Sequence, residues 1–304
     1  MNKTNNSKPT LVITGSSGFV GQSLAKAALN FGYDVIGLDI KINSLLEFKQ
    51  HQIDLANEDF YNLVPKESVI IHLASMSTDL LCKNNPSGAI EVNLSATVRV
   101  VENANRINSR HLIFASSEWV YPERQEFCDQ YESEVLDLAN LKSIYAISKL
   151  TGESLIRCTS QIPFSILRFG IIYGPRKFPG SAVESIASKV FLGGSVEVGS
   201  SKTSRSFIFI DDLIAGILRV VEVGKEITGI GPMNISGSKL YSLGEIVEIL
   251  NLHLNRNVEI KEAGASPSIR NPNITKAKET LGWEPKTNLI EGVQRCLIEM
   301  NILK

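Results

Sequence analysis

Cysteine and histidine are scarce in this chain of 304 residues. The chain carries only Cys82, Cys128, Cys158, Cys296, His51, His72, His111 and His253. Because the cysteines are far apart and form no C-x-x-C pair, they indicate free thiols of a reducing cytosol, with metal binding as the weaker alternative. The four histidines are not clustered, so the sequence does not favour a histidine-based catalytic triad or metal centre. We therefore expect a cytoplasmic protein without a bound metal.

An excess of charge and a long apolar run are also missing. The net charge is -1, so no basic field attracts nucleic acid or a membrane surface. No apolar run approaches the roughly 20 residues that span a bilayer. The polar start, residues 1–10, lacks the apolar segment of a secretory signal, so none is expected. With 43% apolar and 21% charged residues, the composition is typical of a soluble globular enzyme.

A glycine-rich turn near the start is the first informative motif. Residues 11–14 form an apolar run typical of a buried strand, and a helical pattern extends over about 18–30. Gly15, Gly18 and Gly21 lie at this junction, where backbone N–H groups and a helix N-terminus can hold a pyrophosphate. The spacing is G-x-x-G-x-x-G rather than the tighter G-x-G-x-x-G. A tight bend alone would explain the same glycines.

Asp39 ends a second apolar run, residues 33–39, and follows Gly21 by 18 residues. An acid in this position accepts hydrogen bonds from the adenosine ribose hydroxyls. A carboxylate there would repel a 2′-phosphate, which favours NAD over NADP, although Lys41 leaves NADP open. A solvated acid at the end of a strand is the alternative.

The segment Tyr145-Ala-Ile-Ser-Lys149 is the second informative motif. On a helix these two residues are i and i+4, so their side chains share one face. A phenol titrates near pH ~10, and a neighbouring cation stabilises its phenolate. With the glycine turn, this pair predicts redox chemistry at a carbon that bears a hydroxyl; a surface tyrosine is the alternative.

Strand-like runs alternate with helical patterns through the first half, at residues 11–14, 33–39, 69–74, 111–116 and 164–169. A helix is expected over 89–107 between two of these runs. This alternation predicts an α/β fold, a Rossmann-type doubly wound parallel sheet covered on both faces. Ligands of such sheets bind beyond the carboxyl ends of the strands, where these motifs fall.

We expect two domains. The NAD-binding Rossmann domain covers residues 10–175, and 207–225 is expected to return to it. The regular alternation fades after residue 176, so 176–206 and 226–304 are expected to form a smaller, mixed α/β C-terminal lobe that binds the substrate. Short helices are expected over 242–254 and 273–281.

Taken in order, the motifs resemble an extended short-chain dehydrogenase/reductase of the nucleotide-sugar epimerase/dehydratase branch, similar to UDP-glucose 4-epimerases. The resemblance extends from residue 11 to about residue 292. Beyond the glycine turn, it is carried by Asp54-Leu55, His72–Ser75, Asn93, Ser116–Tyr121, Tyr145–Lys149, Leu167–Arg176, Arg205–Asp212 and Ile274–Lys286.

The resemblance implies a role for each catalytic residue. Tyr145 is the acid/base, and Lys149 lowers its pKa and binds the nicotinamide ribose. Ser117 hydrogen-bonds the sugar oxygen, with Ser116 as the nearest rival. His72 is expected to be a packed strand-end residue rather than a base.

The resemblance also implies an NAD site and a nucleotide-sugar site. The cofactor residues are Gly15, Ser17, Gly18, Phe19, Val20, Gly21, Asp39, Asp54, Leu55, Leu73, Ala74, Ser75, Asn93, Tyr145 and Lys149. The substrate residues are Ser117, Glu118, Tyr145, Arg176 and Arg205. Arg205 lies in a Gly/Ser-rich loop, and its guanidinium fork matches a diphosphate; a generic surface arginine is the alternative.

Several positions depart from the family pattern. Family 4,6-dehydratases carry an Asp-Glu pair where this chain has Glu118 and Trp119, which argues against dehydration. Glu118 can act as a second acid/base, hold a sugar hydroxyl or be an outward-facing loop acid. Ile171 replaces a substrate-contacting asparagine, Pro122 replaces a glycine, and residues 270–273 follow the family form only loosely.

The sequence therefore predicts an NAD-dependent epimerase of a nucleotide-activated sugar, such as a UDP-hexose at C4, that works by transient oxidation and hydride return. A reductase or dehydratase of a nucleotide sugar is the alternative. A non-catalytic dinucleotide sensor is disfavoured because Ser117, Tyr145 and Lys149 are all present. By analogy we expect a homodimer formed through helices 89–107 and 144–158.

Overall fold

The computed structural model describes residues 8–227 and 229–303. Most of the polar start considered above, residues 1–7, lies outside the described part. The chain divides into two compact units. The first holds the described residues up to Val120 together with Asp137–Leu167 and Ile217–Pro232. The second holds Tyr121–Leu136, Arg168–Gly216 and the described residues from Met233 onward.

A seven-stranded sheet forms the centre of the fold, in the order β11-β6-β5-β4-β1-β2-β3. Its strands are β1 (Leu11–Thr14), β2 (Val35–Asp39), β3 (Lys49–Gln52), β4 (Val69–His72), β5 (His111–Ser117), β6 (Phe164–Phe169) and β11 (Met233–Ile235). β1 pairs in parallel with β2 and β4, β2 with β3, and β4 with β5. The sheet, flanked by helices, confirms the predicted Rossmann-type α/β fold.

The apolar runs of the sequence correspond to strands that are buried on both faces of the sheet. Every residue of β1, β4 and β5 is buried, as expected for parallel strands covered on both faces. β3 differs, because its sequence is Lys-Gln-His-Gln and it forms one edge of the sheet. A polar edge strand has no apolar run, so the sequence analysis did not predict it.

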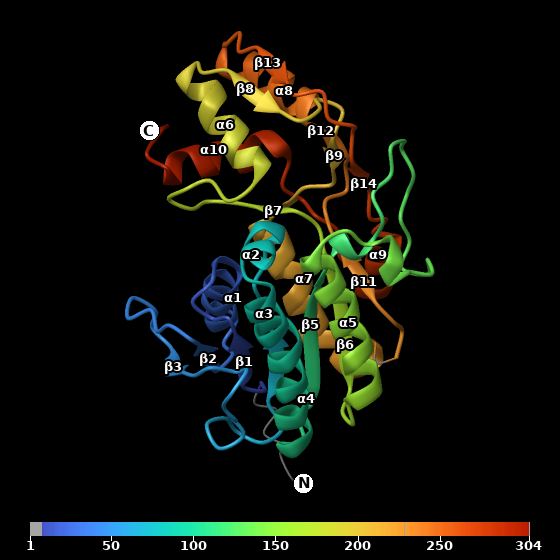
Figure 1. Cartoon of the computed structure of the whole chain (residues 1–304). Helices are drawn as coiled ribbons and strands as arrows, with labels where there is room; N and C mark the ends of the chain where they lie inside the picture. Colours follow the sequence, from blue (N-terminus) through green and yellow to red (C-terminus); the bar gives the residue numbers. More distant parts are fainter. Residues whose placement is uncertain (1–7, 228, 304) are drawn as a thin grey trace. The chain divides into compact units, whose positions relative to one another are not determined.

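Helices cover the sheet of the first unit (Figure 1). The helices that lie wholly in the first unit are α1 (Phe19–Asn30), α2 (Asp79–Asn84), α3 (Pro86–Ile90), α4 (Ala96–Arg106) and α5 (Ile144–Thr159). α1 packs on β1 and β2, α5 packs on β5, and α4 lies beside α5. The single helix predicted over 89–107 is instead α3, a π-helical turn at Glu91–Ser95, and α4.

The second unit is the smaller mixed α/β lobe. Its strands are β7 (Ile172–Tyr173), β8 (Val196–Val198), β9 (Ser204–Arg205), β10 (Ile208–Phe209), β12 (Tyr241–Ser242), β13 (Ile260–Glu262) and β14 (Ile269–Arg270). Its helices are α6 (Ala182–Leu192), α8 (Leu243–Leu254), α9 (Thr275–Leu281) and α10 (Leu289–Glu299). The strands form small sheets ordered β10-β7, β12-β9-β14 and β13-β8, and α6 packs against α8 and α10.

Helix α7 (Ile210–Val223) begins in the second unit and ends in the first. Within the described part of the chain, no helix has the length and apolar character of a membrane span.

Candidate active site

The turn between β1 and α1 is built from glycines that leave no room for side chains. Gly15 has φ +70°, and a Cβ there would lie 2.8 Å from the backbone nitrogen of Ala74. A Cβ on Gly21 would lie 2.2 Å from the carbonyl oxygen of Gly15. Gly18 is the N-cap of α1, and no acidic residue occupies the first turn, which contains Phe19 and Val20. This cradle fits a dinucleotide pyrophosphate.

The Asp39 carboxylate lies against the glycine turn. It accepts hydrogen bonds from the backbone nitrogen of Ser17, at 2.9 Å, and from that of Lys41, at 3.1 Å. The Ser17 hydroxyl donates to the Lys41 carbonyl at 2.6 Å. The end of β2 is therefore fixed beside the turn with a negative charge, which fits ribose hydroxyls better than a 2′-phosphate.

Asp54 and Leu55 follow β3. The backbone nitrogen of Ile53 donates to the Asp39 carbonyl at 2.8 Å, which ties this segment to the end of β2. The Asp54 carboxylate accepts from the backbone nitrogen of Ala56 at 3.0 Å, so it stabilises its own turn. Leu55 is buried.

The residues that follow β4 are tied to the end of β1, beside the glycine turn. The Thr14 hydroxyl accepts hydrogen bonds from the backbone nitrogens of Leu73 and Ala74, both at 3.1 Å. The Ser75 hydroxyl oxygen is buried and has no hydrogen-bond partner among the described residues. Because a buried hydroxyl without a partner is costly, this oxygen fits a polar group of the cofactor.

His72 is a packed strand-end histidine. Its Nδ1 lies 2.7 Å from the Thr14 hydroxyl, and its Nε2 lies 3.0 Å from the Thr97 hydroxyl. Burial, assisted by the positive charge of Lys149, lowers the pKa of His72 to about 3. The ring therefore stays neutral and is engaged through both nitrogens.

Asn93 links three segments from within the π-helical turn. Its Oδ1 accepts from the backbone nitrogen of Met76 at 2.7 Å, and its Nδ2 donates to the Ser148 hydroxyl at 2.9 Å. Ser148 in turn donates to the Tyr145 carbonyl at 2.8 Å. Through these hydrogen bonds Asn93 holds α5 beside the segment that follows β4. π-Helical turns frequently occur at functional sites.

Tyr145, Lys149 and Ser117 come together where β5 ends and α5 begins. Ser143 caps α5 by accepting from the backbone nitrogen of Ala146 at 3.2 Å, which places Tyr145 in the first turn. The Ser117 side chain lies close enough to the Tyr145 phenol to lower the pKa of Tyr145 by hydrogen bonding. The Lys149 ammonium lies 5.8 Å from the centroid of the Tyr145 ring.

The two adjacent serines on β5 have different partners. Ser116 donates to the fully buried Glu153 carboxylate at 2.6 Å, whereas Ser117 pairs with Tyr145. The Ser117 hydroxyl also accepts from the backbone nitrogen of Trp119 at 3.2 Å. Ser117, not its rival Ser116, is therefore the serine beside the phenol.

The electrostatics of this group differ from the expectation. Burial raises the pKa of Tyr145 to about 12, against the lowering effect of the Ser117 hydrogen bond, and the charges of Cys82 and Glu118 raise it further. Burial also lowers the pKa of Lys149 to about 8. Lys149 donates to the Ala115 carbonyl at 2.8 Å. Desolvation thus outweighs the cation effect that the motif predicts.

Glu118 is fully buried in a 3₁₀ turn, residues 118–120, so the outward-facing alternative is wrong. The negative charge of the Glu118 carboxylate raises the pKa of Tyr145. The indole of Trp119 meets the Tyr145 ring edge-on, with ring centroids 6.1 Å apart and planes at 75°. A carboxylate and an indole therefore lie beside the phenol, and the indole is not an acid or base near neutral pH.

Arg176 and Arg205 belong to the second unit. Arg176 makes a bidentate ion pair with the fully buried Glu184 of α6, with its Nη2 2.7 Å from Oε1. A substrate role for Arg176 requires this pair to open. Arg205 donates through Nη1 to the Ser204 carbonyl and through Nη2 to the Ser268 hydroxyl, both at 2.8 Å.

Arg270 is a charged residue to which the sequence analysis assigned no role. Strand β14 pairs with β9 in a register that sets Arg270 opposite Arg205. The Nη2 atoms of Arg270 and Arg205 lie 3.1 Å and 4.0 Å from the same Oε1 of Glu123. Two short strands separated by over sixty residues create this cluster, and no local pattern signals their pairing.

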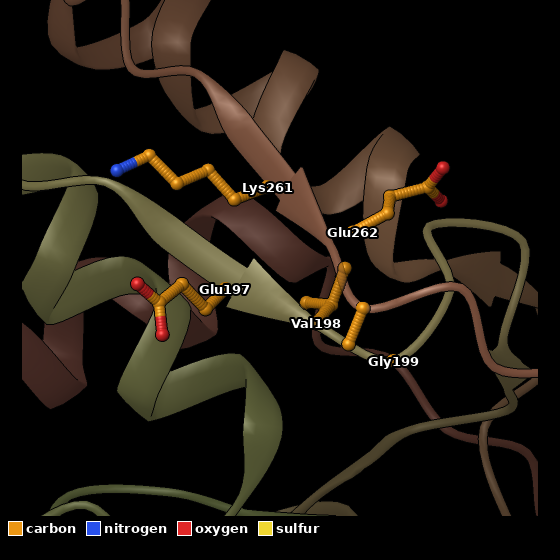
Figure 2. Close-up of a pocket in the computed structure, with 6 residues that line it drawn as sticks. Glu197, Val198, Gly199, Lys261 and Glu262 are labelled. Atoms are coloured by element: carbon orange, nitrogen blue, oxygen red, sulfur yellow. The ribbon is translucent and has the colours of Figure 1, made fainter.

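A surface hollow at β8 and β13 holds no sequence-predicted site residue. Glu197, Val198, Gly199, Lys261, Glu262 and Ala263 line it. Figure 2 shows Glu197 and Lys261 on one side of the strand pair and Glu262 on the other. The described residues that line the hollow carry side chains of both charge signs and no hydroxyl or thiol nucleophile, in contrast to the surroundings of Tyr145.

Known proteins resemble the chain over most of its length. Residues 11–236 match the model of the NAD dependent epimerase/dehydratase family. UDP-glucuronic acid decarboxylase 2 of Arabidopsis thaliana is 30% identical over 93% of this chain, and the chain spans 66% of that relative, just under two thirds. The uncharacterized UDP-glucose epimerase YtcB of Bacillus subtilis (strain 168) is 30% identical, with 93% of this chain and 95% of the relative covered.

A solved structure gives the same result for the fold. The UDP-glucuronic acid 4-epimerase of Bacillus cereus, in complex with UDP-glucuronic acid and NAD, superposes with a TM-score of 0.84 at 25% identity. The match covers 96% of this chain and 99% of that one.

Proposed function

Since this chain belongs to the NAD dependent epimerase/dehydratase family, we propose that it is an epimerase of a nucleotide-activated sugar, such as a UDP-hexose at C4. NAD is the cofactor of this family. The observation that carries the proposal is the group formed by Ser117, Tyr145 and Lys149, with an indole where dehydratases carry a second carboxylate.

The residues that hold NAD in this proposal are the glycine turn for the pyrophosphate, Asp39 for the adenosine ribose and Ser75 for a polar group of the cofactor. Bound NAD supplies a reversible hydride acceptor. Tyr145 takes the proton of the sugar hydroxyl during oxidation and returns it during reduction. Ser117 steadies the sugar oxygen, and Lys149 holds the nicotinamide ribose.

The phenol must lose its proton despite its burial. The Ser117 hydrogen bond favours the phenolate, and an oxidised nicotinamide ring nearby adds a positive charge that favours it further. We expect the pKa of Tyr145 to fall from about 12 when the oxidised cofactor binds. Glu118 serves as a second acid/base or as an acceptor for a sugar hydroxyl.

A UDP-sugar is the proposed substrate class, because the named relatives and the Bacillus cereus enzyme are described by UDP-sugars. The diphosphate is assigned to Arg205 and Arg270, whose guanidinium groups converge in the second unit. We also propose a cytoplasmic homodimer formed through α4 and α5, with Ile147, 37% exposed, on the contact face.

Purified protein with NAD+ should interconvert UDP-glucose and UDP-galactose, or UDP-glucuronic acid and its C4 epimer, with no net NADH. Proton NMR of the anomeric signals follows the conversion, and a Tyr145→Phe protein provides the inactive control. If neither pair interconverts, the epimerase assignment is wrong.

Decarboxylation of UDP-glucuronic acid is the second candidate, because the Arabidopsis relatives bear that name. Oxidation at C4 of that sugar creates a β-keto acid, which loses carbon dioxide readily, and it needs the same Ser117, Tyr145 and Lys149. Release of carbon dioxide with formation of a UDP-pentose would favour this reading. Net NAD(P)H consumption or loss of water would instead indicate a reductase or dehydratase.

A further inference from the structure

The Glu123 carboxylate faces two of the arginines of the second unit, Arg205 and Arg270. Glu123 Oε1 lies 3.1 Å from Arg270 Nη2 and 4.0 Å from Arg205 Nη2. The side chains of Arg270 and Arg205 are 5% and 11% exposed, whereas the Glu123 side chain is 54% exposed. The cluster therefore combines two enclosed cations with one accessible anion.

The arginines are held by groups other than Glu123. Arg270 donates through Nε to the Tyr121 carbonyl at 3.2 Å. Arg205 donates to the Ser204 carbonyl and to the Ser268 hydroxyl. The β9–β14 register fixes their backbones opposite each other. If the Glu123 carboxylate swings outward, both guanidinium groups keep these anchors, and their positive charges remain at one place.

We propose that Glu123 is a displaceable internal counter-ion of an anion site formed by Arg205 and Arg270. The ligand class is a diphosphate, which brings more than one negative charge and acceptor oxygens for two guanidinium groups. The diphosphate replaces the carboxylate on binding, and the carboxylate returns when the ligand leaves. This inference rests on the proposed nucleotide-sugar substrate. It identifies Glu123 as a residue that lowers the affinity of the protein for the diphosphate of that substrate.

Calorimetric titration of the full chain tests this exchange, with inorganic pyrophosphate and UDP as probes. Glu123→Gln keeps the size of the side chain and removes its charge, and Glu126→Gln is the control, because Glu126 is an exposed acid of the same segment. We expect Glu123→Gln to bind both probes at least three-fold more tightly than wild type. Glu126→Gln should change either affinity by less than two-fold.

Equal or weaker binding by Glu123→Gln overturns the proposal, as does the absence of pyrophosphate binding in both proteins. Arg270→Gln should weaken pyrophosphate binding at least ten-fold, provided that circular dichroism shows it folded; Arg205→Gln is the second variant if it is not. The binding measurement does not depend on catalytic activity. If Glu123→Gln binds the probes more tightly while no UDP-sugar is converted, the epimerase assignment is wrong and the role of Glu123 as a counter-ion is supported.

Discussion

The Tyr145 side chain is buried, packs edge-on against Trp119, and has its pKa lowered by the neighbouring Ser117 side chain against the effect of burial. Tyr145→Phe removes only the hydroxyl, so the ring packing is preserved. Because the hydroxyl is the proposed proton carrier, we expect kcat to fall by about 10²- to 10⁴-fold. NAD binding, measured by calorimetry, should stay within two-fold of wild type. Normal turnover by the variant would exclude Tyr145 as the acid/base.

The adjacent serines at the end of β5 offer a matched pair of substitutions. Ser116→Ala leaves the buried Glu153 without a 2.6 Å hydrogen bond, so we expect a loss of about 1–3 kcal/mol in the free energy of unfolding. Ser117→Ala removes the hydroxyl beside the Tyr145 phenol, so we expect a lower kcat, whereas Ser116→Ala leaves that hydroxyl in place and should retain turnover. Urea titrations and steady-state rates measure the two effects. The opposite assignment of effects would mean that Ser116 is the catalytic serine.

At the scale of elements, the β1–α1 turn depends on crowding as well as on backbone conformation. Gly15→Ala and Gly32→Ala both place a Cβ at positive φ, +70° and +75°, which costs about 1–2 kcal/mol each. Only Gly15 has another backbone in the way, that of Ala74, whereas no atom lies within 4 Å of a Cβ on Gly32. We therefore expect both variants to lose stability, and only Gly15→Ala to lose NAD affinity, by at least ten-fold. Equal NAD affinity in the two variants would contradict a cofactor site at this turn.

The elements that the sequence predicted correctly are those with local signals. Buried parallel strands read as apolar runs, and the helix that carries Tyr145 begins at a serine cap. The polar edge strand β3 has no such signal, and the π-helical turn at 91–95 contains Asn93, whose contacts with Met76 and Ser148 join segments distant in the sequence. The Tyr145 pKa depends on burial, which a motif does not encode. The convergence of Arg205 and Arg270 depends on a strand register that is set at long range.

For the whole molecule, two buried histidines link stability to pH. Burial lowers the pKa of His72 to about 3 and that of His111 to about 4, whereas both titrate near pH ~6.5 when unfolded. The unfolded chain therefore binds more protons below pH ~6.5, and stability falls as the pH falls from there toward the folded values. Between pH 7.5 and pH 5 we expect a loss of roughly 2 kcal/mol for each histidine. Urea midpoints at the two pH values test this, and a His111→Gln protein should show a smaller difference; identical wild-type midpoints would exclude the linkage.

The path of the chain between its two compact units has a practical consequence. The chain passes between them at 120/121, 136/137, 167/168, 216/217 and 232/233, and the fourth passage lies inside helix α7. No single cut therefore releases the first unit by itself, and truncation at any of these points divides a unit between two peptides. Attempts to graft the first unit onto another protein would have to carry three separate stretches of polypeptide, one of which begins inside helix α7.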